Sequence, residues 1–240
     1  MTNSILHKLC IRFRYFLSQG KRRPVAKQYL KGAGIEIGAL HLPLAVSSRA
    51  RVKYVDRLPV SELRLQYPEL REYRLAHVDI IDDGETLGKI ESESLDFVIA
   101  NHFLEHCENP IGAIKTFLRV LKKGGIIYLA IPDKRFTFDS DRPITKLEHI
   151  IKDYTEGPEW SHDKHFHEWR ILVDRKFRDD PKRHIETLMD NRYSIHFHVW
   201  TYLELFELMI YLKRDVNFYF DVKEFVASGN ENIFILEKTG

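Results

Sequence analysis

Short apolar runs alternate with helical patterns from residue 33 onward, and this alternation limits the fold more than any other feature of the sequence. Strands that alternate with helices in this way are typical of βαβ units, which build a parallel sheet. The expected buried strands are 34–37, 52–55, 73–78, 95–100 and 125–131, with the weakest pattern at 73–78. A chain of 240 residues is long enough for one full-sized α/β domain with an insertion.

The clearest helix is predicted between the strands at 95–100 and 125–131. Asn109 is a good N-cap and Pro110 suits the first helical position. The apolar face is Ile111, Ile114, Phe117, Leu118 and Leu121, and Lys122, Lys123 and Gly124 close the helix. A right-handed crossover through this helix makes the two flanking strands parallel, so their carboxyl ends share one edge of the sheet.

The alternation of strands and helices stops at residues 132–199, which are rich in histidine, aspartate, arginine and aromatic residues. We interpret 133–199 as a largely helical and looped insertion. A helix is expected at Thr201–Leu212, with Leu203, Phe206, Leu208, Met209 and Leu212 available for the core. Residues 218–226 and 232–236 then predict a C-terminal antiparallel hairpin, which gives a sheet of about seven strands.

The first 32 residues are predicted to be an amphipathic helix and a linker that precede the domain at 33–240. Residues 3–19 carry apolar side chains at helical spacing, with basic residues between them. Such a helix either covers an edge of the domain or makes a peripheral contact with a membrane surface. Its charged residues predict neither a membrane span nor a secretory signal.

Charge and cysteine content restrict the partner and the compartment. Lysine and arginine number 37 against 35 acidic residues, so a nucleic acid partner is not expected. The only cysteines, Cys10 and Cys107, form no metal or disulfide motif. This usage is typical of a reducing compartment, and we expect a cytoplasmic location.

Two features at predicted strand ends indicate a ligand site. The segment GIEIGALH, residues 34–41, places a glycine where the first strand leaves the sheet, so that the backbone there can approach a ligand closely. Asp56 ends the second strand, where a carboxylate can accept hydrogen bonds from two adjacent ribose hydroxyls. The acidic residues at 79–83 follow the third predicted strand. They either form a solvated turn or place a group that can hydrogen-bond the edge of an adenine ring.

Together with LDFVIANHFLEH at 95–106 and LKKGGIIYLAIP at 121–132, these features resemble the class I S-adenosylmethionine-dependent methyltransferases, in particular the methyltransferase type 11 group. The resemblance implies a Rossmann-like fold and S-adenosylmethionine as cofactor. It implies a cofactor-binding set of Glu36, Gly38, Ala39, Asp56, Arg57, Asp82, Asp83, Gly84, Asn101 and His102. The register of the adenine-contacting acid among Asp79, Asp82 and Asp83 stays open.

One departure from the family pattern lies in the first loop. The family usually has glycines two and four positions after the one that matches Gly38, whereas this chain has Leu40 and Leu42. An alternative function is therefore a domain that binds S-adenosylmethionine without catalysing methyl transfer.

His102, Glu105 and His106 match the HxxEH pattern of inverted zinc peptidases. On a helix, positions 102 and 106 would share one face, as a two-histidine zinc site needs. A zinc hydrolase is thus a further alternative, although the motif follows a buried strand in a methyltransferase-like context. Some methyltransferases of the ubiquinone pathway hold a divalent ion at this turn. Glu105 and His106 can equally hydrogen-bond neighbouring loops. No metal is therefore predicted.

The insertion is the best candidate for the acceptor site, because it follows directly on the predicted strand at 125–131. Its histidines and tryptophans suit a small polar or glycan-type acceptor. Alternatively, these side chains build a small satellite core. They are Trp160, His162, His165, His167, Trp169, His196, His198 and Trp200. We therefore predict methyl transfer to oxygen. A hydroxyl acceptor needs a base. His102 is the first choice, and His165 and His167 are the reserves.

Overall fold

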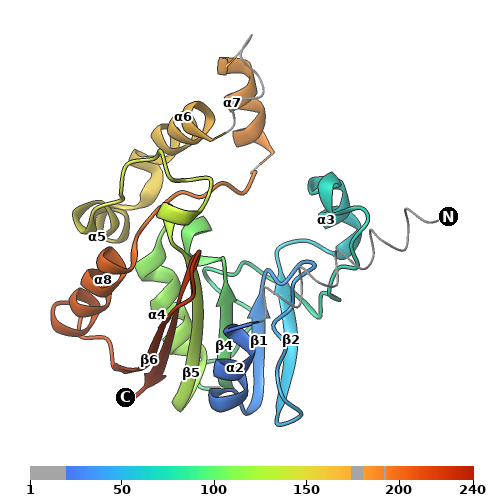
Figure 1. The fold of residues 1–240 in the computed structure, drawn as a ribbon, viewed down its shortest axis with the longest axis vertical. Coiled ribbons are helices and arrows are strands. Elements are labelled where there is room, and N and C mark those ends of the chain that lie inside the picture. The colour runs from blue at the N-terminus through green and yellow to red at the C-terminus, as the bar shows by residue number, and fades with distance from the viewer. Residues whose placement is uncertain (1–19, 174–180, 192) are drawn as a thin grey trace.

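A seven-stranded sheet forms the centre of the computed structural model, which describes residues 20–173, 181–191 and 193–240. The strand order is β3-β2-β1-β4-β5-β7-β6 (Figure 1). The strands are β1 (Gly32–Ile37), β2 (Ala50–Asp56), β3 (Ile80–Ile81), β4 (Leu95–Asn101), β5 (Leu121–Pro132), β6 (Phe220–Ala227) and β7 (Glu231–Lys238). The helices are α2 (Arg22–Tyr29), α3 (Val60–Gln66), α4 (Pro110–Val120), α5 (Leu147–Glu156), α6 (His162–Leu172), α7 (Pro181–Asp190) and α8 (Tyr202–Arg214).

The predicted Rossmann-like fold is confirmed. Strands β1 to β5 are parallel to one another, while β7 is antiparallel to both β5 and β6. The C-terminal hairpin therefore closes one side of an otherwise parallel sheet. The carboxyl ends of β1, β2, β3 and β4 meet at a single edge, which is where ligands bind in open sheets of this kind.

Helices bury both faces of the sheet, which explains why the central strands are continuous apolar runs. In β4, Phe97 and Ile99 face the core that contains Val25 and Ala26 of α2. Val98 and Ala100 point to the opposite face and share its core with α4 and α8. A strand covered on both faces has no solvent side on which polar residues would alternate with apolar ones.

Two helix starts follow the predicted capping chemistry. The side chain of Asn109 accepts a hydrogen bond from the Gly112 amide at 2.8 Å, at the start of α4. Thr201 and Glu204 form a reciprocal capping box at the start of α8. One detail was wrong: Leu203, expected in the core, is 61% exposed, because the face of α8 that packs on the sheet is centred on Leu205 and Leu208.

The third strand lies further along the chain than predicted. Residues 73–78 form no strand, and the sheet is extended instead by the two residues Ile80 and Ile81, which pair with the end of β2. The amide of Ala76 donates to the carbonyl of Leu40 in the loop after β1. Segment 73–78 thus hydrogen-bonds with that loop rather than with the sheet.

The N-terminal segment differs in part from the predicted helix and linker. Residues 3–19 lie outside the described residues. The expected linker contains helix α2, whose Arg22, Val25 and Ala26 are buried. Arg22 forms a buried ion pair with Glu231 at the start of β7. Helix α2 is therefore packed into the domain rather than separate from it.

The insertion packs its helix α5 against α4 and α8, while its helices α6 and α7 extend beyond the carboxyl edge of the sheet (Figure 1). It contains α5, α6 and α7 and has a small apolar cluster of its own, made of Phe166, Ile185, Leu188, Ile195 and Phe197. Its ends lie side by side, because Asp133 forms a parallel bridge with Trp200. Among the described residues, no helix combines the length and hydropathy of a membrane span.

Candidate functional site

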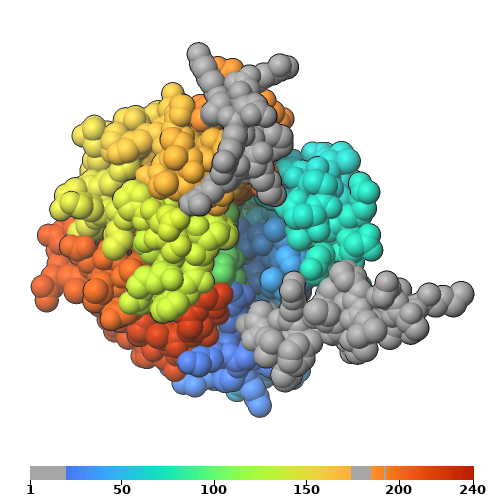
Figure 2. Space-filling model, turned by 45° about the horizontal axis from the view of Figure 1, so that its top comes forward, coloured from blue at the N-terminus to red at the C-terminus, as the bar shows by residue number. Residues whose placement is uncertain are grey.

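The predicted cofactor residues gather along the carboxyl edge of the sheet. The Gly38 amide donates to the Val55 carbonyl at 2.9 Å, and the Asp82 amide donates to the Asp56 carbonyl at 3.0 Å. These bonds connect the ends of β1, β2 and β3. Figure 2 shows the edge as a hollow whose floor is formed by blue and green atoms of the strand ends, between the yellow insertion and the cyan atoms near α3. We call this hollow the edge cleft.

Glu36 is completely buried within β1. Both of its carboxylate oxygens accept from the Leu44 amide at 3.0 Å, and one accepts from Asn101 Nδ2 at 3.1 Å. Leu40, in the loop between them, takes a positive φ of 45°. The carboxylate therefore holds a left-handed loop in which leucine occupies a position that usually favours glycine.

Burial raises the pKa of Glu36 to about 7, although hydrogen bonds from Leu44 and Asn101 act to lower it. The folded protein thus binds a proton more tightly than the unfolded chain does. We expect the free energy of unfolding to fall by about 2 kcal/mol between pH 5 and pH 7 through this group alone. Denaturant titrations at several pH values measure how the free energy of unfolding changes with pH. Between pH 5 and pH 7 this change should be smaller for Glu36→Gln than for the wild-type protein. An equal change in both proteins would contradict the raised pKa of Glu36.

Two glycines have opposite roles at the edge cleft. Gly38 has a φ of +62°, and the nearest atom that a Cβ there would meet is in Phe103 at 4.0 Å. Space is therefore open in front of Gly38. A Cβ at Gly84 would lie 2.6 Å from both Ile37 and Phe103, so this glycine serves close packing.

The acids after β2 and β3 are placed differently from one another. Asp56 is partly buried at the end of β2, and burial raises the pKa of its carboxyl group. Asp82 follows β3 at the edge, where its two oxygens accept from the amides of Asp83 and Lys89. Asp83 caps the next turn by accepting from Glu85. Asp79 lies before β3. Its side chain accepts from the amide of Tyr54 inside β2, so Asp79 is set back from the carboxyl edge of the sheet.

His102 directly follows β4 and is joined to a charged pair. Its Nε2 lies 2.9 Å from Glu231, which also accepts from Arg22. Burial alone would raise the pKa of Glu231, but the bonds from Arg22 and His102 outweigh it and hold this pKa at about 2. An ionised carboxylate can only accept a hydrogen bond, so Nε2 of His102 carries a proton and donates it to Glu231.

The helix required for a zinc peptidase motif is absent from this turn. His102 has a φ of +49°, and only the three residues Leu104–His106 form a short 3-10 turn. His102 and His106 thus do not share one face of a helix. The Nδ1 atom of His106 instead lies 2.8 Å from the Ile195 carbonyl, in the insertion. The expectation that Glu105 and His106 would hydrogen-bond neighbouring loops is confirmed for His106 and wrong for the side chain of Glu105, whose two oxygens have no hydrogen-bond partner.

A buried polar cluster lies beside His102, made of Glu105, His106, Asp139 and His196. His196 Nδ1 lies 2.7 Å from Asp139, and His102 Nδ1 lies 3.7 Å from Glu105. Burial raises the pKa of Glu105 to about 7, and neither of its oxygens has a hydrogen-bond partner. Glu105, His106 and His196 place ligand atoms within 4.8 Å of one another, which makes them one of two candidate metal groups among the described residues.

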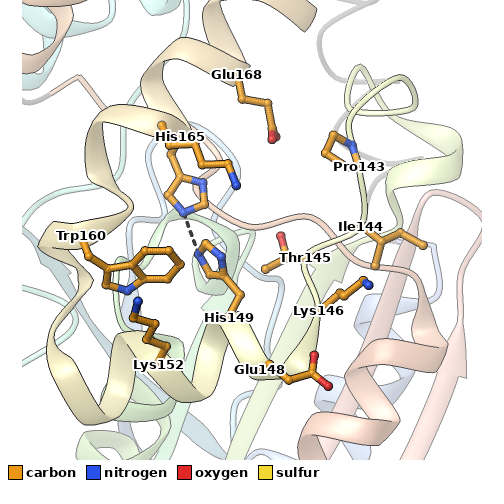
Figure 3. A pocket seen from close by; sticks show the side chains of 11 residues that line it. Pro143, Ile144, Thr145, Lys146, Glu148, His149, Lys152, Trp160, His165 and Glu168 are labelled. Atoms are coloured by element: carbon orange, nitrogen blue, oxygen red, sulfur yellow. Dashed lines mark hydrogen bonds between the residues drawn. The ribbon is translucent and has the colours of Figure 1, made fainter.

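The two reserve bases lie elsewhere, on α6. His167 is exposed, on the opposite face of the helix from the buried His165. His165 Nε2 lies 3.0 Å from His149 Nε2 of α5, and both residues line a pocket of about 440 Å³ within the insertion (Figure 3). Burial lowers the pKa of His165 to about 3. The structure therefore brings neither reserve residue to His102.

Several site residues were missed by the sequence analysis. Arg22 and Glu231 carry no motif, and each is more than 75 residues from His102 along the chain. Asp139 likewise shows no local pattern. One signal was available: His149 and Asp153 are four residues apart in a predicted helical segment, so they share a face.

Comparison with known proteins is consistent with this geometry. A family model for a methyltransferase domain matches residues 32–129, from β1 into β5. A search among curated proteins gives no match.

Solved structures share the fold at low sequence identity. A methyltransferase from Thermotoga maritima, described as S-adenosylmethionine-dependent and as a possible histamine N-methyltransferase, is 17% identical with a TM-score of 0.50; the match covers 100% of this chain and 96% of that one. A protein from Pyrococcus horikoshii is also 17% identical, with a TM-score of 0.52 and coverage of 95% and 91%. At these identities the likeness concerns the fold alone.

Proposed function

We propose that this protein, a class I S-adenosylmethionine-dependent methyltransferase, transfers the methyl group to an oxygen atom of a small polar or glycan-type acceptor. The observation that supports transfer to oxygen is the hydrogen-bonded pair of His102 and Glu231 at the end of β4. This pair holds a partly exposed imidazole at the carboxyl end of β4. A hydroxyl acceptor needs such a group, because it must lose its proton as the new bond forms.

The residues of the edge cleft fit S-adenosylmethionine. Open space in front of Gly38 allows close approach to the backbone, and Asp56 offers a partly buried carboxylate at the end of β2. Asn101 Oδ1 is buried with no hydrogen-bond partner, so it can accept from a ligand. When bound, the cofactor supplies an electrophilic methyl group on its sulfonium centre. Gly38, Asp56 and Asn101 are the residues that we expect to hold it.

His102 is proposed to accept the hydroxyl proton at Nδ1. Glu231 keeps the proton on Nε2 and stabilises the imidazolium that forms, while Arg22 keeps Glu231 ionised. This arrangement orients the base as the carboxylate of a catalytic triad orients its histidine. The remaining contribution of the chain is to position the acceptor oxygen in line with the bond that breaks.

The acceptor class is inferred from the side chains beside the edge cleft. Phe136 and Phe138 follow β5 and are 61% and 58% exposed. The ring of Phe138 lies 4.8 Å from that of His196, next to the buried polar cluster. Flat apolar rings beside hydrogen-bonding groups suit the faces and hydroxyls of a sugar ring.

Cofactor binding is tested by Asp56→Ala. We expect the substitution to weaken S-adenosylmethionine binding by about 1.5–3 kcal/mol, because it removes a charged acceptor at the end of β2. Isothermal titration calorimetry measures this directly. Asp163→Ala is the matched control, since that aspartate is 81% exposed on α6. An unchanged dissociation constant in a folded Asp56→Ala protein would remove Asp56 from the site.

Transfer to oxygen is tested with methyl-labelled cofactor and a panel of hydroxyl acceptors, including monosaccharides and phenols, beside matched amines. We expect labelled methyl ethers and no labelled amine. Product formed only with amines would contradict the proposed acceptor atom and leave the cofactor assignment intact.

A further inference from the structure

Three histidines of the insertion place ring nitrogens close to one another, and Asp153 lies beside two of them. His149 and Asp153 lie one turn apart on α5, His165 lies on α6, and His198 lies in the segment that returns to Trp200. His149, His165 and His198 place their ligand atoms within 4.8 Å of one another. Asp153 Oδ2 lies 3.3 Å from His149 Nε2 and 3.6 Å from His198 Nε2. We call these four residues the His149 cluster.

The spacing within the His149 cluster suits a tetrahedral ion. Zinc bonds to imidazole nitrogen and carboxylate oxygen are about 2.0–2.1 Å long, so two ligand atoms of a regular tetrahedron lie about 3.3 Å apart. The contact between His149 Nε2 and His165 Nε2 is 3.0 Å, and the two contacts to Asp153 are similar. For the pairs His149–His165, His149–Asp153 and His198–Asp153, these distances bracket the tetrahedral value.

Hydrogen bonding within the chain leaves the His149 cluster unsatisfied. His198 Nε2 and Asp153 Oδ2 are buried and have no hydrogen-bond partner, a costly state for polar atoms. The other oxygen of Asp153 accepts from the Ser161 hydroxyl at 3.2 Å, which fixes the orientation of the carboxylate. Such outer hydrogen bonds commonly orient metal-binding carboxylates. A cation between the four side chains would satisfy both orphaned atoms at once.

We propose that His149, Asp153, His165 and His198 bind one zinc ion in a closed, structural site. Three imidazoles and one carboxylate are a donor set that zinc favours, and four protein ligands fill its tetrahedral coordination. The ion would tie α5, α6 and the segment around His198 together. The apolar cluster of the insertion is small, and a metal ion is a common way to stabilise such a unit.

The proposed zinc site also bears on the pocket within the insertion. Figure 3 shows His149 and His165 facing each other at the pocket, with Trp160 beside them. The ion would hold both pocket-lining imidazoles in place. The proposal does not depend on the methyl acceptor, and the zinc site is distinct from Glu105, His106 and His196 near the edge cleft.

The first test measures the metal in the full-length protein purified without chelators. Elemental analysis should find about one zinc per chain, and His149→Ala and His198→Ala should each lose most of it. His167→Ala, an exposed histidine on the same helix as His165, is the matched control and should keep the ion. His196→Ala should also keep it, because that residue belongs to the other candidate group. Zinc that is lost in His196→Ala and kept in His149→Ala would overturn the proposal.

A second measurement covers the case in which the cluster variants do not fold. Metal-free wild-type protein is titrated with cobalt(II), which absorbs visible light strongly only in tetrahedral coordination. We expect this absorption to saturate at one equivalent and to disappear when zinc is added. Removing zinc should also lower Tm by about 5 °C or more, and adding it back should restore Tm. A folded wild-type protein that binds neither ion, or whose Tm does not respond to zinc, would overturn the proposal.

Discussion

Replacing His102 by alanine is expected to lower turnover by about 100-fold or more and to leave the dissociation constant of S-adenosylmethionine nearly unchanged. The structure gives the reason: His102 Nε2 is held by Glu231, so Nδ1 is the atom available to take a proton. Steady-state kinetics with a hydroxyl acceptor from the panel measures kcat, and calorimetry measures cofactor binding. Most of the loss should appear in kcat, since proton removal contributes to the transition state.

Glu231→Gln separates positioning from catalysis in the same assay. Glutamine can hold Nε2 by a hydrogen bond but cannot stabilise an imidazolium, so kcat should fall less than in His102→Ala, and the pH profile of kcat should shift. Full turnover in His102→Ala together with its loss in His167→Ala would place the base in the insertion. Full turnover in both variants would mean that the acceptor needs no base from either residue.

Arg22→Ala should lower the free energy of unfolding by about 3–5 kcal/mol, because it leaves the buried carboxylate of Glu231 without its cation. Both side chains of this ion pair are at least nine-tenths buried. Removing one partner of such a pair costs far more than the pair itself contributes. Chemical denaturation followed by circular dichroism measures the change.

The neighbouring exposed Arg23 offers a control for Arg22→Ala. Arg23→Ala should change stability by less than about 0.5 kcal/mol, as exposed substitutions usually do. The double variant Arg22→Met with Glu231→Gln should recover part of the loss, since it buries no unpaired charge. Equal stabilities for Arg22→Ala and Arg23→Ala would show that the Arg22 to Glu231 pair does not form in solution.

The sequence predicted those features that depend on neighbouring residues. Continuous apolar runs gave β4 and β5, because a strand buried on both faces has no polar side. Asn109 and Pro110 gave the start of α4, since capping chemistry acts within one turn. The positions of Gly38 and Asp56 at strand ends followed from the same local patterns, and the parallel arrangement then brought those ends to one edge.

The sequence was less informative where a segment hydrogen-bonds across the fold. Residues 73–78 look like a strand locally, yet Ala76 bonds to the loop after β1 and the sheet continues at Ile80 and Ile81 instead. A two-residue strand has no periodicity to detect. The HxxEH pattern likewise predicted a helical face, whereas His102 lies outside the short 3-10 turn at Leu104–His106.

The sequence alone thus determined the class of fold and which polar residues stand at the strand ends, because both follow from burial and capping within short windows. Only the tertiary structure decided which distant side chains meet. Glu231 reaches His102 because β7 inserts antiparallel beside β5, and Arg22 reaches Glu231 because α2 packs on the sheet. His149 and His198 meet because the chain turns back through the insertion. Such contacts are set by the packing of whole elements, which no local pattern of residues encodes.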